Sequence, residues 1–456
     1  MSRIAVVGAG IAGLAAAARL AGKHDVVVFE REGRAGGKIR TEQVDGFAFD
    51  WGPNGVLAGN PALRALLSEI GLAGELTPAS PAAAKRFIYW NGALHALPAK
   101  PPDALRMSLL SPLGKLRALG DLFARAPASE DPEESVDAFM RRHFGAEVAE
   151  RIVAPALLGV SGGDARETSV DAAFPRVREL ERTQGSVIRG MARARGGAGR
   201  LSSFGAAGMQ RLTDRLAELL GERIRFGAPV ERVERHGAGW RVHHRGGSGA
   251  RAPGEDAADV DALIVATPAD AAARLLAPAD DELAALLRRI PYAPMRVVGI
   301  AFASSDVPAA LDGFGFLAAR DQGVRILGAV YTSSLFREQA PEGAAYLRVF
   351  LGGAVDPGAA ALDPQEARAL VRADLRTVLG VTAEPLAYQD VVWPRAIPQY
   401  RLDHRALVSS IEARVASHPG LGLTGNAYRG LGVADAVRDG RTVAGALTGD
   451  PGETIP

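Results

Sequence analysis

The sequence predicts an α/β fold: a discontinuous Rossmann-type dinucleotide-binding domain, an α+β domain with a mixed sheet, and an inserted helical domain. Three observations carry this prediction. Residues 4–30 read as strand, glycine turn, helix and strand, and residues 421–447 repeat the strand–turn–helix order. Between them, from residue 98 to about 190, the pattern changes to helical periodicities with few strand signals.

The first unit has the features of a dinucleotide-binding turn. Residues 4–7 are a short apolar run, typical of a buried parallel strand. Gly8, Gly10 and Gly13 then form G-x-G-x-x-G at the entrance to an alanine-rich helix. In this pattern the first glycine permits the tight turn, the second lets the backbone approach a pyrophosphate, and the third lets the helix pack on the strand. The helix N-terminus favours the phosphate charge.

An acidic residue completes the unit. Residues 25–29 form a second apolar strand, and Glu30 ends it about 20 residues after the glycines. A carboxylate at this place accepts a hydrogen bond from a ribose 2′-OH. It would repel a 2′-phosphate, so the pattern argues against NADP.

The rest of the chain supplies further elements. Arg86–Trp90 and Ala93–Leu97 flank Asn91-Gly92, which predicts a hairpin. Residues 260–266 are another buried strand, 245–258 a loop rich in Gly and Pro, and 365–379 a helix. Further strands are expected over 295–302, 325–331 and 345–351. A glycine-rich turn over 425–432 leads into the last helix, which would point at the far end of the cofactor.

We therefore expect three domains. The dinucleotide-binding domain takes residues 1–80, 204–285 and 405–456; the α+β domain with the mixed sheet takes 81–97 and 286–404; the inserted helical domain takes 98–203.

Composition narrows the function classes. A net charge of +1 without a basic tail argues against a nucleic-acid partner. The absence of Cys removes disulfides, thiolate metal ligands and a cysteinyl link to a cofactor, and it suits a reducing compartment. The first strand follows Met1 directly and no apolar run is long enough to span a membrane, so we expect a cytoplasmic protein. No metal-ligand spacing and no nucleophile elbow is present.

Several motifs, in order, resemble the FAD-dependent amine oxidase-like superfamily: GAGIAGL with Glu30, the GGK patch at 36–38, FDWGPNG at 49–55, VDALIVATP at 260–268 and LTGNAYRGLGV at 423–433. Within it, three segments are similar to the protoporphyrinogen oxidase family: AKRFIYWNGALHALP at 84–98, GFGFL at 313–317 and VVWPRAIPQY at 391–400.

The resemblance implies non-covalent FAD and a porphyrinogen substrate. In this family the flavin removes six electrons from protoporphyrinogen IX in three rounds, giving protoporphyrin IX, and O2 reoxidises it to give H2O2. The implied FAD contacts are Gly8, Ala9, Gly10, Ile11, Ala12, Gly13, Glu30, Arg31, Gly37, Lys38, Gly52, Pro53, Asn54, Gly55, Val230, Trp393, Asn426, Leu431, Gly432 and Val433. No residue of the protein is assigned as a catalytic acid or base, and no residue is assigned as a metal ligand.

The resemblance also implies the substrate contacts Arg86, Gly159, Phe314, Leu317 and Phe350. Arg86 would pair with a propionate, and the apolar side chains would sandwich the macrocycle. Without the resemblance, Arg86 also fits a surface arginine and the apolar residues fit ordinary core positions. Trp393 and Tyr400 flank two prolines, so bracing a turn competes with cofactor contact.

The family suggests peripheral attachment of the helical domain to the cytoplasmic face of a membrane, and a homodimer. Residues 98–125 mix leucines with Arg106, Lys115, Arg117 and Arg125, which suits an anionic membrane surface but equally an ordinary packed amphipathic helix.

Other functions remain open at this stage. Coproporphyrinogen III is the nearest alternative substrate, and its four propionates would need more basic residues, for which Arg176, Arg178, Arg182 and Arg296 are candidates. Amine oxidation is disfavoured because amine oxidases of the superfamily usually keep a lysine in the region that is 290–302 here, and this chain has no lysine after Lys115. A carotenoid desaturase and a flavoprotein-like scaffold without turnover are more distant alternatives.

Overall fold

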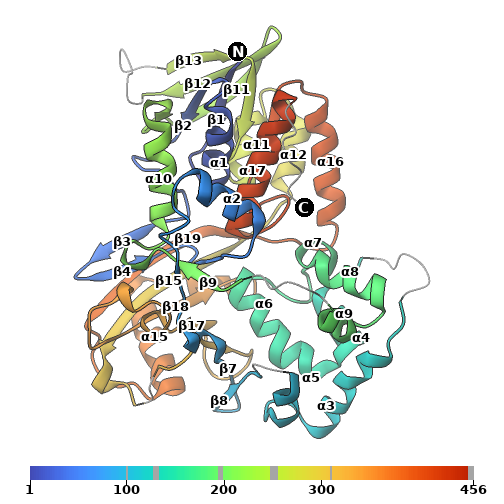
Figure 1. The fold of residues 1–456 in the computed structure, drawn as a ribbon, viewed down its shortest axis with the longest axis vertical. Coiled ribbons are helices and arrows are strands. Elements are labelled where there is room, and N and C mark those ends of the chain that lie inside the picture. The colour runs from blue at the N-terminus through green and yellow to red at the C-terminus, as the bar shows by residue number, and fades with distance from the viewer. Residues whose placement is uncertain (99–100, 127–132, 194–198, 247–254, 309–310, 450–456) are drawn as a thin grey trace.

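The computed structural model describes residues 1–98, 101–126, 133–193, 199–246, 255–308 and 311–449. A five-stranded parallel sheet, a seven-stranded mixed sheet and a group of helices occupy three parts of the molecule (Figure 1).

The parallel sheet has the strand order β10-β2-β1-β14-β20. Its strands are β1 (Arg3–Val7), β2 (Asp25–Phe29), β10 (Ile224–Arg225), β14 (Ala262–Val265) and β20 (Leu421–Leu423). Residues from the start, the middle and the end of the chain thus form one sheet. β1 and β14 are buried almost throughout, as expected for parallel strands with both faces covered.

Each face of this sheet has its own core. Ile4 and Val6 pack on one side and Ala5 and Val7 on the other, because successive side chains alternate. The first side is covered by α1 (Ile11–Leu20), α2 (Pro61–Glu69), α10 (Gln210–Leu220) and α17 (Val433–Thr448). The second side is covered by α11 (Ala269–Leu276), α12 (Asp281–Arg288), α16 (His404–Ala416) and a sheet of β11 (Val230–His236), β12 (Gly239–Arg245) and β13 (Glu255–Val260).

The mixed sheet has the order β19-β15-β18-β17-β16-β7-β8, with a single parallel pair, β16–β7. Its strands are β7 (Arg86–Trp90), β8 (Ala93–Ala96), β15 (Tyr292–Ala303), β16 (Gly315–Ala318), β17 (Gly328–Val330), β18 (Ala344–Gly352) and β19 (Ala387–Pro398). One face packs on α14 (Pro357–Ala360) and α15 (Pro364–Leu379). The other packs on the hairpin β3 (Thr41–Val44) and β4 (Phe47–Asp50).

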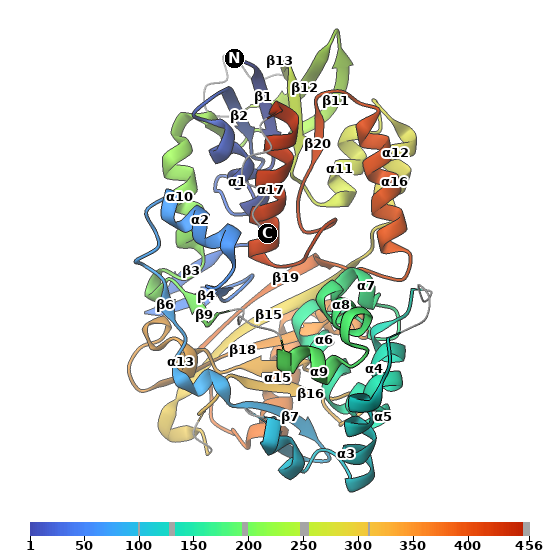
Figure 2. The same ribbon diagram turned by 45° about the vertical axis from the view of Figure 1, so that its right-hand side comes forward.

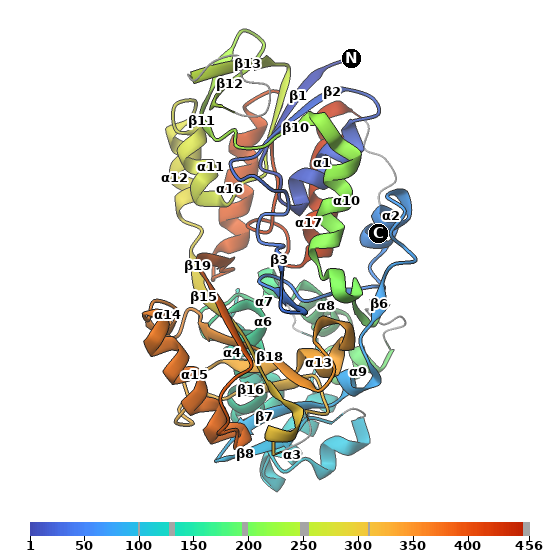
Figure 3. The same ribbon diagram turned by 90° about the vertical axis from the view of Figure 1, so that its left-hand side faces the viewer.

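Small elements join the two sheets. β5 (Val56–Leu57), β6 (Thr77–Pro78) and β9 (Leu201–Ser203) form a three-stranded sheet, and α13 (Thr332–Leu335) lies beside β18. The long strands β15 and β19 run from the mixed sheet toward the parallel sheet (Figure 3). The 3₁₀ helices are Pro81–Ala84, Pro101–Arg106, Gly120–Phe123, Gly205–Ala207, Gly221–Arg223, Ser304–Asp306 and Arg337–Gln339.

The helical part contains α3 (Pro112–Leu119), α4 (Val136–Phe144), α5 (Ala146–Val148), a π-helical turn (Ala149–Val153), α6 (Ala154–Ser161), α7 (Val170–Ala173), α8 (Pro175–Gln184) and α9 (Val187–Arg193). A small core around Val136, Phe139 and Leu157 holds it together. The helical character predicted for this stretch is confirmed.

Two local predictions have different outcomes. The hairpin β7–β8 is confirmed, and its turn has positive φ at both Asn91 (48°) and Gly92 (75°), the geometry that an Asn-Gly pair favours. The loop expected over 245–258 is wrong at its end, because Glu255–Val260 pairs with β12 as a strand. Hydrogen bonding to β12 therefore makes the end of this segment a strand in spite of its loop-like composition. The remainder of the loop, 247–254, lies outside the described residues.

Candidate functional site

The turn between β1 and α1 has the geometry that its glycines predict. A Cβ on Gly13 would lie 2.1 Å from the Gly8 carbonyl oxygen, so the helix approaches the strand as closely as only glycine permits. Gly8 has φ +105°. Around Gly10, in contrast, no atom of the other described residues lies within 4 Å of a built Cβ, apart from its chain neighbours and the backbone of its own helix. The turn therefore has tight internal packing and open space at the middle glycine.

The N-terminus of α1 has no side-chain cap, since Gly10 occupies the capping position. The first-turn N–H groups of a helix have no partner within the helix. An anion in the open space beside Gly10 would meet these donors and the positive end of the helix dipole.

Glu30 lies directly after β2 and is buried, with 8% of its surface exposed. Its two carboxylate oxygens accept hydrogen bonds from the N–H of Ala9, at 2.8 Å, and of Glu32, at 2.9 Å. These bonds orient the carboxylate at the turn, and a carboxylate retains further acceptor positions for a ribose hydroxyl. The Ala228 N–H donates to the Glu30 carbonyl oxygen, and this bond brings the start of β11, with the predicted contact Val230, close to Glu30.

The second glycine patch lies against the first turn. The Gly36 N–H donates to the Ala9 carbonyl oxygen at 2.8 Å, and a Cβ on Gly37 would lie 3.5 Å from the Gly10 Cα. Next to it, the Lys38 ammonium donates to the Ala396 carbonyl oxygen on β19 at 2.6 Å and lies 5.2 Å from the Tyr292 ring centroid. Burial lowers the Lys38 pKa to about 8, against the opposing effect of Asp270.

The segment 52–55 runs beside this lysine. A Cβ on Gly52 would lie 1.9 Å from the Lys38 carbonyl oxygen, and one on Gly55 would lie 2.8 Å from the Ser202 carbonyl oxygen. The Trp393 indole donates to the Trp51 carbonyl oxygen at 2.9 Å. The Asn54 side-chain nitrogen is buried and has no hydrogen-bond partner within the described structure. The structure thus brings residues 37–38, 52–55 and 393 together.

The C-terminal turn is held by two residues whose role the motif does not reveal. The Tyr400 hydroxyl donates to the Asn426 carbonyl oxygen at 2.9 Å and accepts from the Gly430 N–H at 2.8 Å. Asp439 accepts from Thr424 and Gly425 and pairs with Arg429. The sequence left two interpretations of Tyr400 open, cofactor contact and the bracing of a turn; these hydrogen bonds show that it braces the C-terminal turn, and its contact with the cofactor stays a prediction.

Helix α17 then packs along α1 (Figure 2): a Cβ on Gly440 would lie 2.2 Å from the Ala12 carbonyl oxygen. The two ends of the chain therefore meet at one turn. Asp435 in the first turn of α17 accepts from the Gly432 N–H at 3.2 Å, and its charge offsets part of the positive helix end.

The predicted substrate residues form an adjoining wall. A Cβ on Gly159 of α6 would lie 2.2 Å from the Leu317 side chain. In the register of the mixed sheet, Leu317 of β16 lies opposite Gly328 of β17, and Gly328 lies opposite Phe350 of β18. Phe350 and Trp393 pack in the same apolar cluster, with Leu158 and Met295. The wall therefore reaches the residues predicted to contact the cofactor.

Arg86 marks the other end of this wall. It is exposed, and its guanidinium lies 5.1 Å from the Phe314 ring centroid. In the strand register, Arg86 of β7 lies opposite Gly315 of β16. The Phe314 N–H donates to the Lys85 carbonyl oxygen. Of the five predicted substrate residues, Gly159 thus lies on α6, Arg86, Leu317 and Phe350 lie on strands of the mixed sheet, and Phe314 directly precedes β16.

The arginines considered as additional anchors mostly have other partners. Arg178 lies in the polar core of the helical part, where it pairs with Asp171 at 3.0 Å and Glu181 at 2.7 Å. Arg182 lies 3.7 Å from Asp171. Arg296 is buried on the mixed sheet beside Asp390, at 3.3 Å. Arg176 is exposed.

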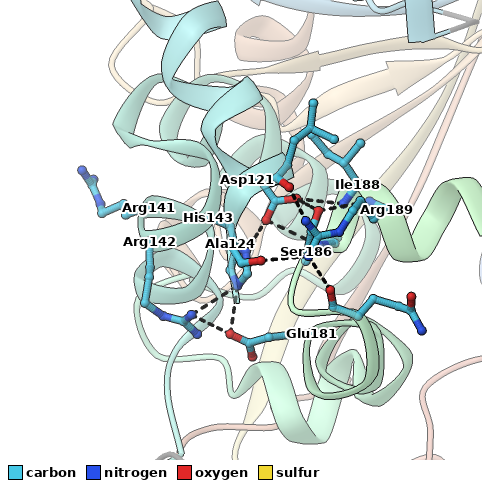
Figure 4. Close-up of polar contacts among 12 residues, drawn as sticks. Asp121, Ala124, Arg141, Arg142, His143, Glu181, Ser186, Ile188 and Arg189 are labelled. Carbon is cyan, nitrogen blue, oxygen red and sulfur yellow. Dashed lines mark hydrogen bonds and ion pairs between the residues drawn. The ribbon is translucent and has the colours of Figure 1, made fainter. Parts of the chain in front are cut away.

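The polar core of the helical part is centred on His143 (Figure 4). One ring nitrogen contacts Asp121 and the other contacts Glu181 at 3.0 Å. Burial opposes ionisation of Glu181, but hydrogen bonds from Arg142, His143 and Arg178 outweigh it and lower its pKa to about 2. The carboxylates of this cluster each contact a basic side chain within the protein, which indicates a structural role.

Comparison with known proteins agrees with this geometry. A family model described as flavin containing amine oxidoreductase matches residues 11–448. Protoporphyrinogen oxidase 1 of Arabidopsis thaliana is 31% identical over 97% of this chain and 86% of its own length. Coproporphyrinogen III oxidase of Bacillus subtilis is 27% identical over 98% of both chains. A crystal structure from Exiguobacterium sp. 255-15, provisionally named a protoporphyrinogen oxidase, superposes with a TM-score of 0.83 at 24% identity over 98% of both chains.

The cofactor is FAD, and the residues present fit it: α1 is uncapped beside the open space at Gly10, and Gly37 and Lys38 link this turn to segment 52–55, where the Asn54 amide has no partner within the described structure. The chain belongs to the flavin-containing amine oxidoreductase family and, within it, to the protoporphyrinogen oxidase group.

Proposed function

We propose that this protein oxidises protoporphyrinogen IX to protoporphyrin IX, with O2 as the acceptor and H2O2 as the second product. One observation carries the proposal: the apolar wall of Leu317 and Phe350 has Arg86 at one end and meets Trp393 of the predicted cofactor site at the other. The names of the relatives in plants support it.

The chemistry suits such a site. Oxidation of a porphyrinogen removes six electrons and six protons, which three molecules of O2 take up as three molecules of H2O2. When bound, FAD supplies hydride acceptance and the transfer of electrons to O2. The chain's own residues bind and orient: Leu317 and Phe350 contact the apolar faces of the substrate and exclude water, and the Arg86 guanidinium can bind a carboxylate in a bidentate manner.

The charge distribution favours protoporphyrinogen over coproporphyrinogen. Coproporphyrinogen III carries four propionates, so its site would need cations on several sides. Arg178 and Arg296 are buried among their own partners, and Arg182 faces Asp171. Among the predicted substrate residues, Arg86 is the exposed cation, which suits a substrate with fewer carboxylates.

Coproporphyrinogen III oxidation remains a second candidate because bacterial relatives with that name match the chain over nearly its whole length. Amine oxidation is not favoured: Met295–Val298 occupy the strand where the amine oxidases of the superfamily keep their lysine. Lys38 does not lie on that strand: it belongs to the second glycine patch, and its ammonium donates to the Ala396 carbonyl oxygen of β19.

The decisive experiment compares initial rates on protoporphyrinogen IX and coproporphyrinogen III under air. The FAD-loaded protein is used, with porphyrin fluorescence and H2O2 followed in parallel. We expect faster oxidation of protoporphyrinogen IX and three H2O2 per porphyrin. A preference for coproporphyrinogen III would select the second candidate, and no oxidation of either by flavin-loaded protein would reject both.

We also propose peripheral membrane contact through α3 and the 3₁₀ helix Gly120–Phe123 that follows it. Among the residues described, no helix is both long and apolar enough to cross a bilayer. Leu113, Leu116 and Phe123 nevertheless expose 75%, 67% and 84% of their surfaces. Of the basic residues expected at the membrane, Arg117 instead donates to carbonyl oxygens at the end of α4. Replacing the three apolar residues by Ser should abolish flotation with anionic vesicles; unchanged flotation would exclude α3.

Location in the cytoplasm and a homodimer remain predictions.

A further inference from the structure

Arg348 differs from the other buried arginines of the described structure. Arg178, Arg296 and Arg348 have 3%, 4% and 1% of their surfaces exposed. Arg178 and Arg296 each have a carboxylate within 3.3 Å. Over the described ranges, no carboxylate lies within ion-pair distance of Arg348. Buried charges are normally paired because removing an ion from water is costly, so an unpaired buried cation needs a reason.

The side chain of Arg348 lies between the two proposed sites. It projects from β18, two residues from Phe350, and its guanidinium carbon lies 5.4 Å from the Phe350 ring centroid. One terminal nitrogen donates to the Gly52 carbonyl oxygen at 2.7 Å. The Nε atom is buried without a hydrogen-bond partner. Arg348 thus connects the predicted cofactor segment 52–55 with the predicted substrate wall.

The titratable groups that face Arg348 do not neutralise it. Asp50 on β4 interacts with it only at longer range, because its oxygens accept hydrogen bonds from Thr41, Met209 and Gln339. Burial raises the pKa of Asp50 in spite of Arg348. Tyr346, on the same strand, has a buried hydroxyl without a partner, and burial raises its pKa as well, which keeps it neutral.

We propose that Arg348 is a positioning residue of the redox site. It holds segment 52–55 against Phe350, and its unbalanced positive charge favours the reduced form of the bound flavin. This inference rests on the proposed function. A hydride taken from the porphyrinogen brings two electrons and one proton, so reduction makes the flavin one unit more negative. A fixed cation nearby stabilises that added charge, because the buried site screens it weakly.

The test measures the midpoint potential of bound FAD by spectroelectrochemical titration. Arg348→Gln keeps an N–H donor and removes the charge, whereas Arg348→Lys keeps the charge. For Arg348→Gln we expect about a tenfold shift of the reduction equilibrium toward oxidised flavin, which is about 30 mV for a two-electron couple. Arg348→Lys should recover most of this shift. We also expect Arg348→Gln to lower kcat more than it raises KM.

Arg296→Gln is the matched control, since it removes the same charge from a similarly buried arginine of the same sheet, but one that pairs with Asp390. Its flavin potential should equal that of the wild type. If Arg348→Gln does not fold, Arg348→Met provides the same removal of charge without a polar group to bury.

An unchanged potential in flavin-loaded Arg348→Gln overturns the inference, whatever happens to FAD affinity. An equal shift in Arg296→Gln overturns it too, because the effect would then not be local. Failure of the wild-type protein to bind FAD or to oxidise a porphyrinogen would reject the proposed function instead, so the two failures are distinguishable.

Discussion

Replacing Gly440 by Ala tests whether the two ends of the chain meet as described. Gly440 lies inside α17, where alanine is about 1 kcal/mol more favourable than glycine by intrinsic helix propensity. In the structure, however, the new Cβ would lie 2.2 Å from the Ala12 carbonyl oxygen. The backbone of α1 cannot move away as a flexible side chain could.

The two effects have opposite signs, so the result decides between them. Overpacking against backbone costs about 3 kcal/mol at the upper end of the usual range. After the gain in helix propensity, we expect a net loss of about 2 kcal/mol in the free energy of unfolding. FAD should also dissociate more readily, because α17 follows directly on the turn that contains Asn426.

The assay is urea unfolding followed by circular dichroism, with release of flavin followed by its fluorescence. Gly22→Ala serves as a control, since a Cβ there has no atom within 4 Å and the residue lies just beyond α1. It should change the unfolding midpoint little. If Gly440→Ala is as stable as the wild type or more stable, helix propensity dominates and the close packing of α17 on α1 is refuted.

Three further predictions follow from the site and the helical core. Gly10→Glu should abolish FAD retention, because it puts a negative charge and bulk into the open space at the turn; full flavin absorbance after purification would contradict the assignment of this turn. Arg86→Ala should raise KM for the porphyrinogen about tenfold, as expected for loss of a charge-assisted hydrogen bond, with an unchanged flavin spectrum; an unaltered KM would remove Arg86 from the site. Glu181 has a folded-state pKa of about 2, below its usual 4.5, so its contribution to stability is present above pH 4.5 and is lost as the pH falls toward 2. Unfolding midpoints measured from pH 7 to 3 should therefore decline less steeply for Glu181→Gln, which starts less stable; parallel curves would show that Glu181 does not carry this dependence.

Local motifs predicted the nucleotide-binding turn well because each glycine answers a local demand. Gly8 needs its positive φ, and Gly13 needs the absence of a side chain where the helix meets the strand. Both demands arise within one strand–turn–helix unit. The Asn-Gly hairpin was predictable for the same reason.

Contacts between distant segments were not predictable in the same way. The chain places Tyr400 among prolines and Asp439 inside a helix, and nothing nearby shows that both hold the turn after β20. The environment of Arg348 depends on β4, β18 and segment 52–55 meeting in space. Likewise, Arg178 and Arg296 were candidates for a substrate pocket until their carboxylate partners were located.

The amino-acid sequence alone determined that two strand–turn–helix units flank the chain, that the first has the glycines and the carboxylate expected for a pyrophosphate and a ribose, and that cysteine chemistry plays no part. Those properties depend on backbone conformation and residue type over short distances. The tertiary structure decided which buried charges are paired, which tyrosine and aspartate hold the C-terminal turn, and that the apolar wall adjoins Trp393. Such features arise from the packing of segments hundreds of residues apart, because solvation and pairing of a side chain depend on everything that surrounds it.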